Sequence, residues 1–485
     1  MANLPLTLNF FLCALNHCHW VTVIETSILD QRQARETKKV PHLSFHFMYL
    51  VCKLGNYEIQ EKYYFKKFIV FFFFLLVSEE NKLGCQLSEL PENLIYEIGK
   101  RLTIYADYVR LRSTSKSFQS LLPKLPNHQL SQVPWLMIPP ANDASETHCK
   151  FFSILENKMY KLELPKVQGK LLRGSSCGWV LMIDGYPELN LINPLTRAQI
   201  QLPPIDTFPD VLGYRPYMAD EEYLILRVRP NLPKPAKVQV ESIAYVRDVF
   251  IHKLVLSSNP NTSKEYMARA IYGMVSDLAF CKNGDKKWTL IQQNDQRINH
   301  DIISHKGKFY VLRNDGGLWV GDRNSLPNMT QLVPSLPRTI LNYFSLVRTI
   351  SGEFFMVRKI HELEPISCID HIYSYKTIDF VVYKLDHHQG ELKWRMVKNI
   401  GDNVFFVGIN DSLCISSQNL ARYKGNCIYF TDDYFDCHRE GIVGGHDMGV
   451  YNVEDRSIKP LPGYNYYLSH TMLVWPPPIW FSPNP

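Results

Sequence analysis

The chain has 485 residues, of which 46% are hydrophobic, so it is long enough for a substantial core and about three average domains. Its 53 basic and 47 acidic residues leave a formal net charge of +6 without a long run of Lys or Arg, which argues against nucleic acid as a partner. The 11 cysteines are scattered, odd in number and without CxxC pairs, which indicates reduced thiols in the nucleus and/or cytoplasm.

The first 85 residues differ from the rest of the chain. Leu4–Leu15 is apolar, but no charged region precedes it and no convincing cleavage site follows, which argues against a signal peptide. Phe68–Val77 is apolar over only 10 residues, whereas a membrane-spanning helix needs about 20. We therefore expect no membrane partner, and we expect residues 1–85 to be disordered or to come from a mispredicted start.

Two short amphipathic helices are predicted within residues 86–125. Pro91 and Glu92 suit the opening turn of the first helix, and its apolar stripe consists of Leu90, Leu94, Ile95, Ile98 and Leu102. Asp107 is a candidate N-cap of the second helix, whose recurring positions are Tyr108, Leu111, Ser115, Phe118 and Leu122. Gly99 interrupts the first helix at a cost of about 1 kcal/mol relative to alanine. Because a unit of roughly 40 residues rarely holds its fold alone, we expect this segment to dock on a partner surface.

The helical segment resembles an F-box, the adaptor-binding module of cullin-based ubiquitin ligases. The matching residues are Leu90-Pro91, Leu94-Ile95, Ile98, Arg101-Leu102, Asp107, Arg110-Leu111-Arg112 and Lys116-Ser117-Phe118. The resemblance implies that the segment binds a Skp-family adaptor and, through it, a cullin. It assigns the adaptor contact to Leu90, Pro91, Leu94, Ile95, Ile98, Leu102 and Leu111. A helical hairpin packed on its own downstream domain is the alternative.

Beyond a linker expected at residues 126–147, the hydrophobic pattern changes from helical to alternating. A hairpin is predicted to turn at Glu156-Asn157, and three successive strands are predicted between Trp179 and Leu202. Further strands are predicted at Ser242–Val246, Phe250–Leu256, Trp288–Gln292, Lys308–Arg313, Leu318–Gly321, Glu353–Arg358, Phe380–Leu385, Lys393–Val397, Val404–Gly408, Cys427–Thr431 and Met448–Val453. Turn residues separate nearly all of them.

So many short strands, with no long amphipathic helix between them, predict a mostly all-β fold. Radial repetition multiplies strands without exposing long edges, so we expect a kelch-like β-propeller of about six to eight blades over residues 148–475, preceded by the small α-helical F-box. Residues 476–485 are expected to form a Pro-rich tail. Two packed β-sandwiches are the structural alternative.

Several stretches of this region resemble the KIB-type β-propeller domain of plant F-box proteins, in the order of that family. They are G-S-S-C-G-W-V-L-M-I-D, L-I-N-P-L-T-R-A-Q-I-Q-L-P, K-G-K-F-Y-V-L, V-V-Y-K-L-D, K-G-N-C-I-Y-F-T-D-D and D-M-G-V-Y-N-V-E-D, between Gly174 and Asp455. The resemblance implies substrate reception: the F-box holds the ligase while the propeller captures a protein for ubiquitin transfer. It does not identify the captured protein or the residues that touch it.

Two patterns could indicate chemistry. Gly174 to Gly178 fits the G-x-S-x-G motif of hydrolases, but that motif requires a strand-to-helix turn at Ser176, and a strand is predicted to follow. Cys427, Cys437, His438 and His446 lack the paired spacing of a structural zinc site. We therefore expect no metal, no cofactor and no catalytic residue.

The sequence thus predicts a non-catalytic substrate receptor of an SCF-type ubiquitin ligase, with a Skp-family adaptor, a cullin and an unidentified protein substrate as partners. One alternative is a propeller scaffold whose F-box has lost its adaptor. The other is a propeller hydrolase or oxidase that uses Ser176 or the region of His446.

Overall fold

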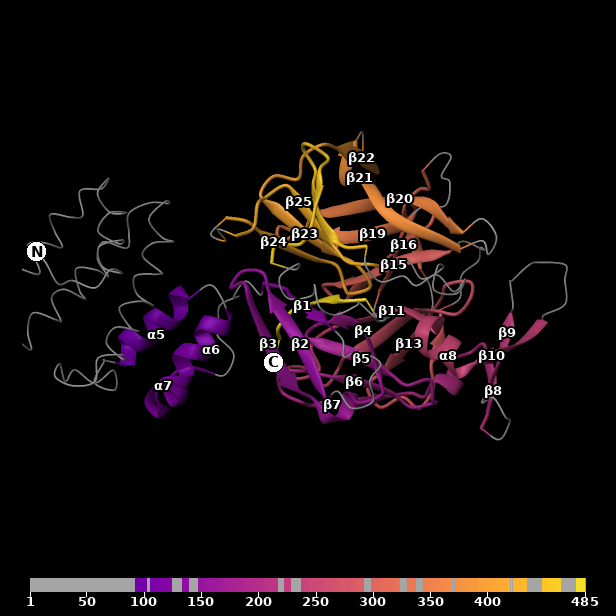
Figure 1. The fold of residues 1–485 in the computed structure, drawn as a ribbon, viewed down its shortest axis with the longest axis horizontal. Helices are drawn as coiled ribbons and strands as arrows, with labels where there is room; N and C mark the ends of the chain where they lie inside the picture. The colour runs from indigo at the N-terminus through magenta and orange to yellow at the C-terminus, as the bar shows by residue number, and fades with distance from the viewer. Residues whose placement is uncertain are drawn as a thin grey trace, which may run out of the picture. The chain divides into compact units, whose positions relative to one another are not determined.

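A computed structural model describes residues 92–102, 105–123, 133–138, 147–216, 222–227, 237–291, 298–322, 329–336, 343–367, 372–388, 390–418, 420, 422–433, 447–463 and 477–484. A short helical segment is followed there by seven small sheets (Figure 1). Residues 1–85, expected to be disordered or mispredicted, lie outside this part. None of the helices in these ranges is long and apolar enough to cross a membrane.

The helical segment contains α5 (Glu92–Arg101), α6 (Tyr105–Ser113) and α7 (Lys116–Leu121). The single second helix predicted from the sequence is therefore divided into two. The division lies at Ser115, whose extended backbone and side-chain oxygen cap a new helix by accepting a hydrogen bond from the Phe118 amide at 3.1 Å. The prediction that Asp107 is an N-cap is wrong, because α6 begins at Tyr105 and Asp107 lies within it.

Six of the sheets have four or five strands, and we name them blades 1 to 6. Blade 1 comprises β28 (Ile479–Phe481), β1 (Trp135–Ile138), β2 (His148–Ser153) and β3 (Lys158–Glu163). Blade 2 comprises β4 (Leu171–Ser176), β5 (Trp179–Ile183), β6 (Leu189–Ile192) and β7 (Gln199–Leu202). Blade 3 comprises β11 (Ile251–Leu256), β12 (Met267–Tyr272), β13 (Asp277–Lys282) and β14 (Thr289–Leu290).

Blades 4 to 6 follow in the second half of the chain. Blade 4 comprises β15 (Asn299–His305), β16 (Lys308–Arg313), β17 (Leu318–Asp322) and β18 (Thr330–Val333). Blade 5 comprises β19 (Tyr343–Arg348), β20 (Phe354–Ser367), β21 (Ile372–His388) and β22 (Glu391–Val397). Blade 6 comprises β24 (Leu413–Ser416), β23 (Asn403–Val407), β25 (Cys427–Phe430), β26 (Gly449–Asn452) and β27 (Ile458–Lys459).

The apolar core shows how the blades are arranged. Among the described residues, six buried clusters each contain side chains from two blades, joining blades 1–2, 2–3, 3–4, 4–5, 5–6 and 6–1. Each blade thus packs against two neighbours, and the sixth cluster closes the ring. Contacts between successive inner strands, β28 with β4, β4 with β11, β11 with β15 and β15 with β19, follow the same order. The described chain is a six-bladed β-propeller, within the predicted range.

The ring is closed by strands from its two ends. In blade 1 the late strand β28 pairs with the early strand β1, with Leu136 opposite Trp480 and Trp135 opposite Phe481. Both strands lie outside the predicted propeller, β1 within the expected linker and β28 within the expected tail, so these two boundaries need correction. The sequence did not predict these boundaries because the pairing of β1 with β28 joins segments far apart in the chain and leaves no local sequence pattern.

The seventh sheet, which we call the insertion sheet, lies between blades 2 and 3 in the sequence. It contains β8 (Val211–Arg215), β9 (Glu222–Arg227) and β10 (Lys237–Ser242), and it stands off from the propeller at the right of Figure 1. The short α8 (Ile243–Tyr245) and the following π-helix η4 (Val246–Phe250) lead back to β11. The strand predicted at Ser242–Val246 is therefore wrong, because the Ser242 hydroxyl accepts from the Tyr245 amide at 3.2 Å and caps a helical turn.

Most other predicted strands are confirmed. The strand predicted at Lys308–Arg313 is β16, the strand predicted at Cys427–Thr431 is β25 and ends one residue earlier, at Phe430, and the first hairpin turns where expected, with Asn157 at a φ of 52°. The predicted strands Glu353–Arg358 and Phe380–Leu385 cover only parts of β20 and β21, which form a much longer hairpin.

Candidate adaptor-binding helices and the polar interior of the propeller

The helical segment has a small core of its own. Ile95, Tyr108, Leu111, Phe118 and Leu122 are all buried, and they come from all three helices and the residue after α7. Helix α7 contacts both α5 and α6. The apolar stripes recognised in the sequence therefore pack against one another in this core, as expected for amphipathic helices.

Gly99 has a packing role that helix propensity does not reveal. A Cβ atom at this position would lie 2.8 Å from Cδ2 of Leu122 and 3.4 Å from Cε2 of Tyr108. The absence of a side chain therefore brings α5 close to the residues that close the core. The helix-propensity cost expected at Gly99 is offset by this close approach.

Polar side chains join α6 to the end of α7. The Arg112 guanidinium donates to the carbonyls of Leu122 at 3.0 Å and Gln119 at 3.2 Å, which would otherwise lack helical partners. The Tyr108 hydroxyl donates to the Pro123 carbonyl at 2.8 Å. Burial of this phenol raises the pKa of Tyr108. These bonds fix the short helix that Ser115 begins.

The predicted adaptor-binding residues occupy different environments. Leu90, Pro91 and the side chain of Leu94 lie outside the described residues. Ile95 and Leu111 are buried in the helical core, 1% and 8% exposed. Ile98 and Leu102 are half-buried. Ile95 and Leu111 therefore have a packing role, whereas Ile98 and Leu102 remain accessible to a partner.

Two exposed apolar side chains on the same helices escaped the sequence reasoning. Tyr96 on α5 is 36% exposed and Val109 on α6 is 39% exposed. Both lie off the stripe that the helical period marks as apolar, so periodicity alone could not identify them. Their apolar surface on a small helical unit is a further candidate contact.

An ionic link joins α6 to blade 1. The Arg110 guanidinium donates to Glu156 Oε1 at 2.9 Å and to the Tyr160 hydroxyl at 2.8 Å. The Tyr160 hydroxyl also donates to Glu156. Burial, together with the bond to this carboxylate, raises the pKa of Tyr160 to about 12. Because Arg110 is more than half exposed, this link contributes little to stability.

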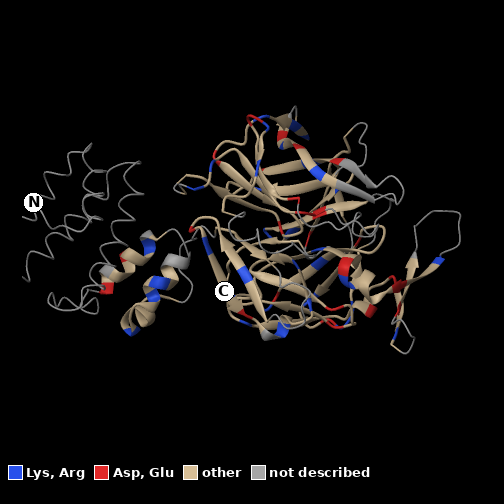
Figure 2. Ribbon diagram, viewed as in Figure 1, with Lys and Arg blue, Asp and Glu red and all other residues tan. Residues whose placement is uncertain are grey.

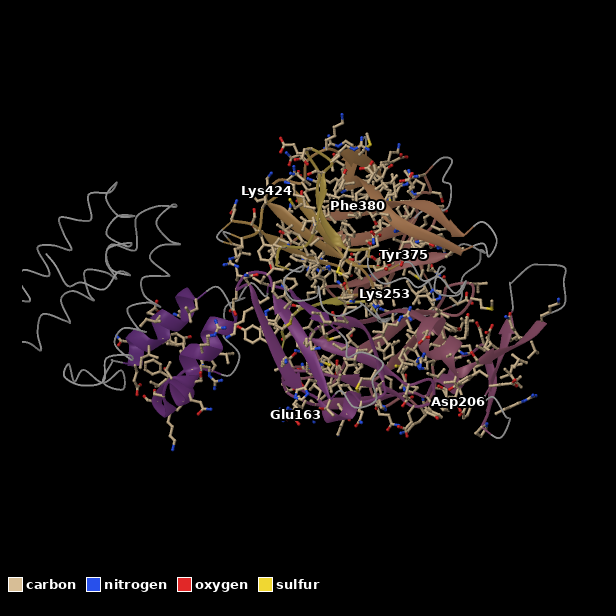
Figure 3. The ribbon with its side chains drawn as sticks, viewed as in Figure 1. Glu163, Asp206, Lys253, Tyr375, Phe380 and Lys424 are labelled. Carbon is tan, nitrogen blue, oxygen red and sulfur yellow. The ribbon has the colours of Figure 1, made fainter. Side chains whose placement is uncertain are left out.

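The inner strands of the propeller enclose a charged pair. Lys253 on β11 and Asp301 on β15 form an ion pair in which both side chains are buried, and Figure 3 places Lys253 deep among the strands. The same carboxylate accepts from the amides of Ile302 and Leu346, each at 2.7 Å. Burial raises the pKa of Asp301, and the ammonium of Lys253 opposes that rise. One carboxylate therefore connects blades 3, 4 and 5.

A second interior carboxylate belongs to blade 6. Oδ2 of Asp411 accepts from the Ser176 hydroxyl at 3.1 Å, and the Asp411 amide donates to the Ser175 carbonyl at 2.8 Å. Burial raises the pKa of Asp411 to about 6, with Lys253 opposing the rise and Asp301 adding to it. The Lys253 ammonium thus lowers the pKa of both interior carboxylates, Asp301 and Asp411, against the effect of burial.

The geometry around Ser176 differs from that of a hydrolase nucleophile. Ser176 ends β4, the turn at Cys177 and Gly178 has φ angles of 53° and 80°, and a strand, β5, follows. Ser176 is 4% exposed, and its hydroxyl accepts from the Leu256 amide at 3.0 Å while donating to Asp411. The motif is a β-hairpin turn without the strand-to-helix turn that exposes a catalytic serine.

Another polar group links blade 5 to blade 6. The buried Lys359 ammonium donates to Asp433 Oδ1 at 2.7 Å and to the Thr431 carbonyl at 3.1 Å. The Tyr375 hydroxyl donates to Asp432 Oδ2 at 2.5 Å. Burial, aided by Lys359, lowers the pKa of His361 to about 4. The imidazole is therefore neutral at neutral pH.

In the part of the chain that the structure describes, no group of three or more His, Cys, Asp or Glu side chains is arranged to hold a metal ion. Cys427 lies buried in β25 as a core residue. Cys437, His438 and His446 lie outside the described residues.

A comparison with protein families matches the KIB1-4 β-propeller over residues 151–452, more than half of the chain. The chain belongs to the KIB1-4 β-propeller family. The matched region begins within β2 of blade 1 and ends at the end of β26 of blade 6, so it covers the ring except for β1, the start of β2, β27 and β28.

Relatives in Arabidopsis thaliana extend the likeness beyond the propeller. F-box/kelch-repeat protein KIB1 is 24% identical over 378 residues, covering 76% of this chain and 82% of the relative. F-box protein KIB4 is 21% identical over 441 residues, covering 84% of this chain and 99% of the relative. Among solved structures, the β-propeller domain of Cps50 (Swd1) from Myceliophteria thermophila covers 67% of this chain and 88% of its own, with 6% identity and a TM-score of 0.31.

Proposed function

We propose that this protein is the substrate-recognition subunit of an SCF-type cullin ubiquitin ligase. Its helical segment binds a Skp-family adaptor, and its propeller binds a protein target. The observation that carries the proposal is the joint presence, on one chain, of F-box-like helices α5 to α7 and a KIB1-4 propeller. Relatives that share most of the chain are named F-box proteins, which supports the same conclusion.

The proposed mechanism is geometric and needs no catalytic side chain. A closed ring in which every blade packs on two neighbours is a rigid platform. A target bound to such a platform stays near the charged ubiquitin carrier, so the effective concentration of its lysines rises. Ser176, the candidate nucleophile, is instead bonded to Asp411 and to the Leu256 amide.

We propose that the adaptor contact begins at Leu90 and Pro91 and continues along α5 and α6. The half-buried Ile98 and Leu102 supply apolar surface there, and the exposed Tyr96 and Val109 add apolar surface on other sides of the same helices. Ile95 and Leu111 support this surface from the core beneath it. This division separates residues whose replacement weakens binding directly from residues whose replacement unfolds the helices.

A pull-down with a purified Skp-family adaptor tests the proposal. Each buried interface anchor is worth 1 kcal/mol or more, so the full-length double variant Leu90→Ala/Pro91→Ala should bind on the order of thirtyfold more weakly. The matched control is Ile350→Ala, which removes an equally apolar side chain that is 65% exposed on the propeller. It should bind like the native chain.

The outcome that contradicts the proposal is equal retention by the native chain and the double variant. That result would favour a propeller scaffold without ligase function. Circular dichroism of each variant separates a lost contact from a lost fold, because Leu90 and Pro91 precede α5 and their replacement should leave the spectrum unchanged.

A further inference from the structure

The insertion sheet has a strand at its border that alternates strictly between two kinds of side chain. β10 is at the end of the strand order β10-β9-β8 within the described chain, and the sheet projects away from the blades in Figure 1. Val238 and Val240 point to one face and are 52% and 50% exposed. Lys237, Gln239 and Glu241 point to the other face, because side chains alternate along a strand.

The apolar face continues onto the neighbouring strand. Val238 is opposite Leu226, and Val240 is opposite Leu224, in the antiparallel pairing with β9. Leu212 on β8 is also 54% exposed. Border strands with exposed apolar side chains tend to pair with another strand, which natural proteins prevent with charges. β10 carries two charges, and their placement decides which strand it can accept.

The two charges of β10 lie at equal distances from Gln239 and have opposite signs. Lys237 lies two residues before Gln239, and Glu241 lies two residues after it. Basic and acidic residues accordingly colour different parts of the projecting sheet in Figure 2. A second β10 that runs antiparallel about Gln239 places Lys237 opposite Glu241 twice, and it places Val238 opposite Val240 twice.

Other registers lack this match. A two-residue shift puts a charge opposite Gln239, and a four-residue shift puts Lys237 opposite Lys237 or Glu241 opposite Glu241. A parallel in-register pairing also brings like charges together. A one-residue shift would set valines beside polar side chains. Opposite charges directly across strands attract and like charges repel, so the charge pattern selects a single arrangement.

We propose that β10 is a self-association surface, through which two copies of this chain join their insertion sheets into one six-stranded antiparallel sheet centred on Gln239. The occupant of the border is thus a second copy, and its chemistry is the complementary pattern of the same strand. This pairing uses no residue of the helical segment, so it leaves both adaptor-binding surfaces of the pair accessible. It therefore stands independently of the ligase assignment.

Sedimentation-velocity measurements on the full-length chain over a concentration series test the pairing. We expect the native chain to dimerise. Lys237→Glu places Glu opposite Glu, and Glu241→Lys places Lys opposite Lys, so each variant alone should dimerise at least about tenfold more weakly. Mixing the two variants restores opposite charges at both positions, so the mixture should form a heterodimer of near-native affinity.

The double variant Lys237→Glu/Glu241→Lys is the matched control. It reverses both charges and should dimerise like the native chain. A native chain that stays monomeric over the whole series overturns the proposal, and so does a mixture that dimerises no better than its components. Adaptor pull-down of the same variants should stay at the native level, which distinguishes failure of this inference from failure of the ligase assignment.

Discussion

The helical segment and the propeller bury their side chains in different ways. In the helical segment, three short helices share one small core, and Gly99 lets α5 approach Leu122 within van der Waals distance. In the propeller, six apolar clusters link each blade to two neighbours, and buried charges connect the inner strands. The comparison teaches that the closed ring encloses ionic groups among its inner strands, whereas the helices are held by close apolar packing and by hydrogen bonds from Tyr108 and Arg112.

The largest effect should follow from breaking the interior ion pair. Lys253→Met leaves the carboxylate of Asp301 buried without its ammonium, which should lower the free energy of unfolding by about 3–5 kcal/mol. Urea denaturation followed by tryptophan fluorescence measures this loss. The double variant Lys253→Met/Asp301→Asn removes both charges and should be more stable than the single variant. A single variant as stable as the native chain would show that the pair is not buried in solution.

A smaller effect concerns pH. The pKa of Asp411 in the folded chain is raised to about 6, above the value of about 3.9 in an unfolded chain. Between these values the folded chain holds the proton more tightly, so the free energy of unfolding should fall as pH rises from about 4 to 6, by about 2–3 kcal/mol. Asp411→Asn should flatten this part of the profile and be at least as stable as the native chain at pH 7. Thermal melting across that pH range measures the slope, and an unchanged slope contradicts the assignment.

The smallest effect tests the helical segment. Gly99→Val introduces a branched side chain against Leu122 and Tyr108 and should destabilise the helices by about 1–3 kcal/mol. Adaptor binding should weaken while the melting temperature of the propeller stays constant. Asn93→Val places the same side chain at an exposed position of the same helix and serves as the control. If both variants bind the adaptor equally well, the close packing at Gly99 does not contribute to the stability of the helices.

Local patterns predicted most of the fold. Alternation and turn residues were sufficient for strands such as β16 and β25, because each of these pairs with strands close by in sequence. The pairing of β1 with β28 was missed, because its partners lie at opposite ends of the propeller and neither segment alternates over more than a few residues. The insertion sheet was also missed, although β10 alternates strictly, because Pro and Gly residues surround its short strands.

The candidate site could be predicted only in outline. Helical periodicity correctly separated apolar from polar faces, but it could not tell Ile95, which is buried in the segment's own core, from Ile98, which is half-buried. Helix propensity marked Gly99 as unfavourable, because the packing role of this residue depends on Leu122, which is more than 20 positions away in sequence. The interior pair of Lys253 and Asp301 has no sequence signature at all, because its partners lie on separate blades.

The position of β28 in chain order has a consequence for biosynthesis. Blade 1 receives its innermost strand from residues 479–481, so the ring stays open until this stretch has left the ribosomal exit tunnel. Until then Trp480 is missing from the cluster between blades 6 and 1, and the apolar surface of that gap is accessible to chaperones. A premature stop codon only a few positions upstream of Ile479 should therefore yield an open ring that quality control removes.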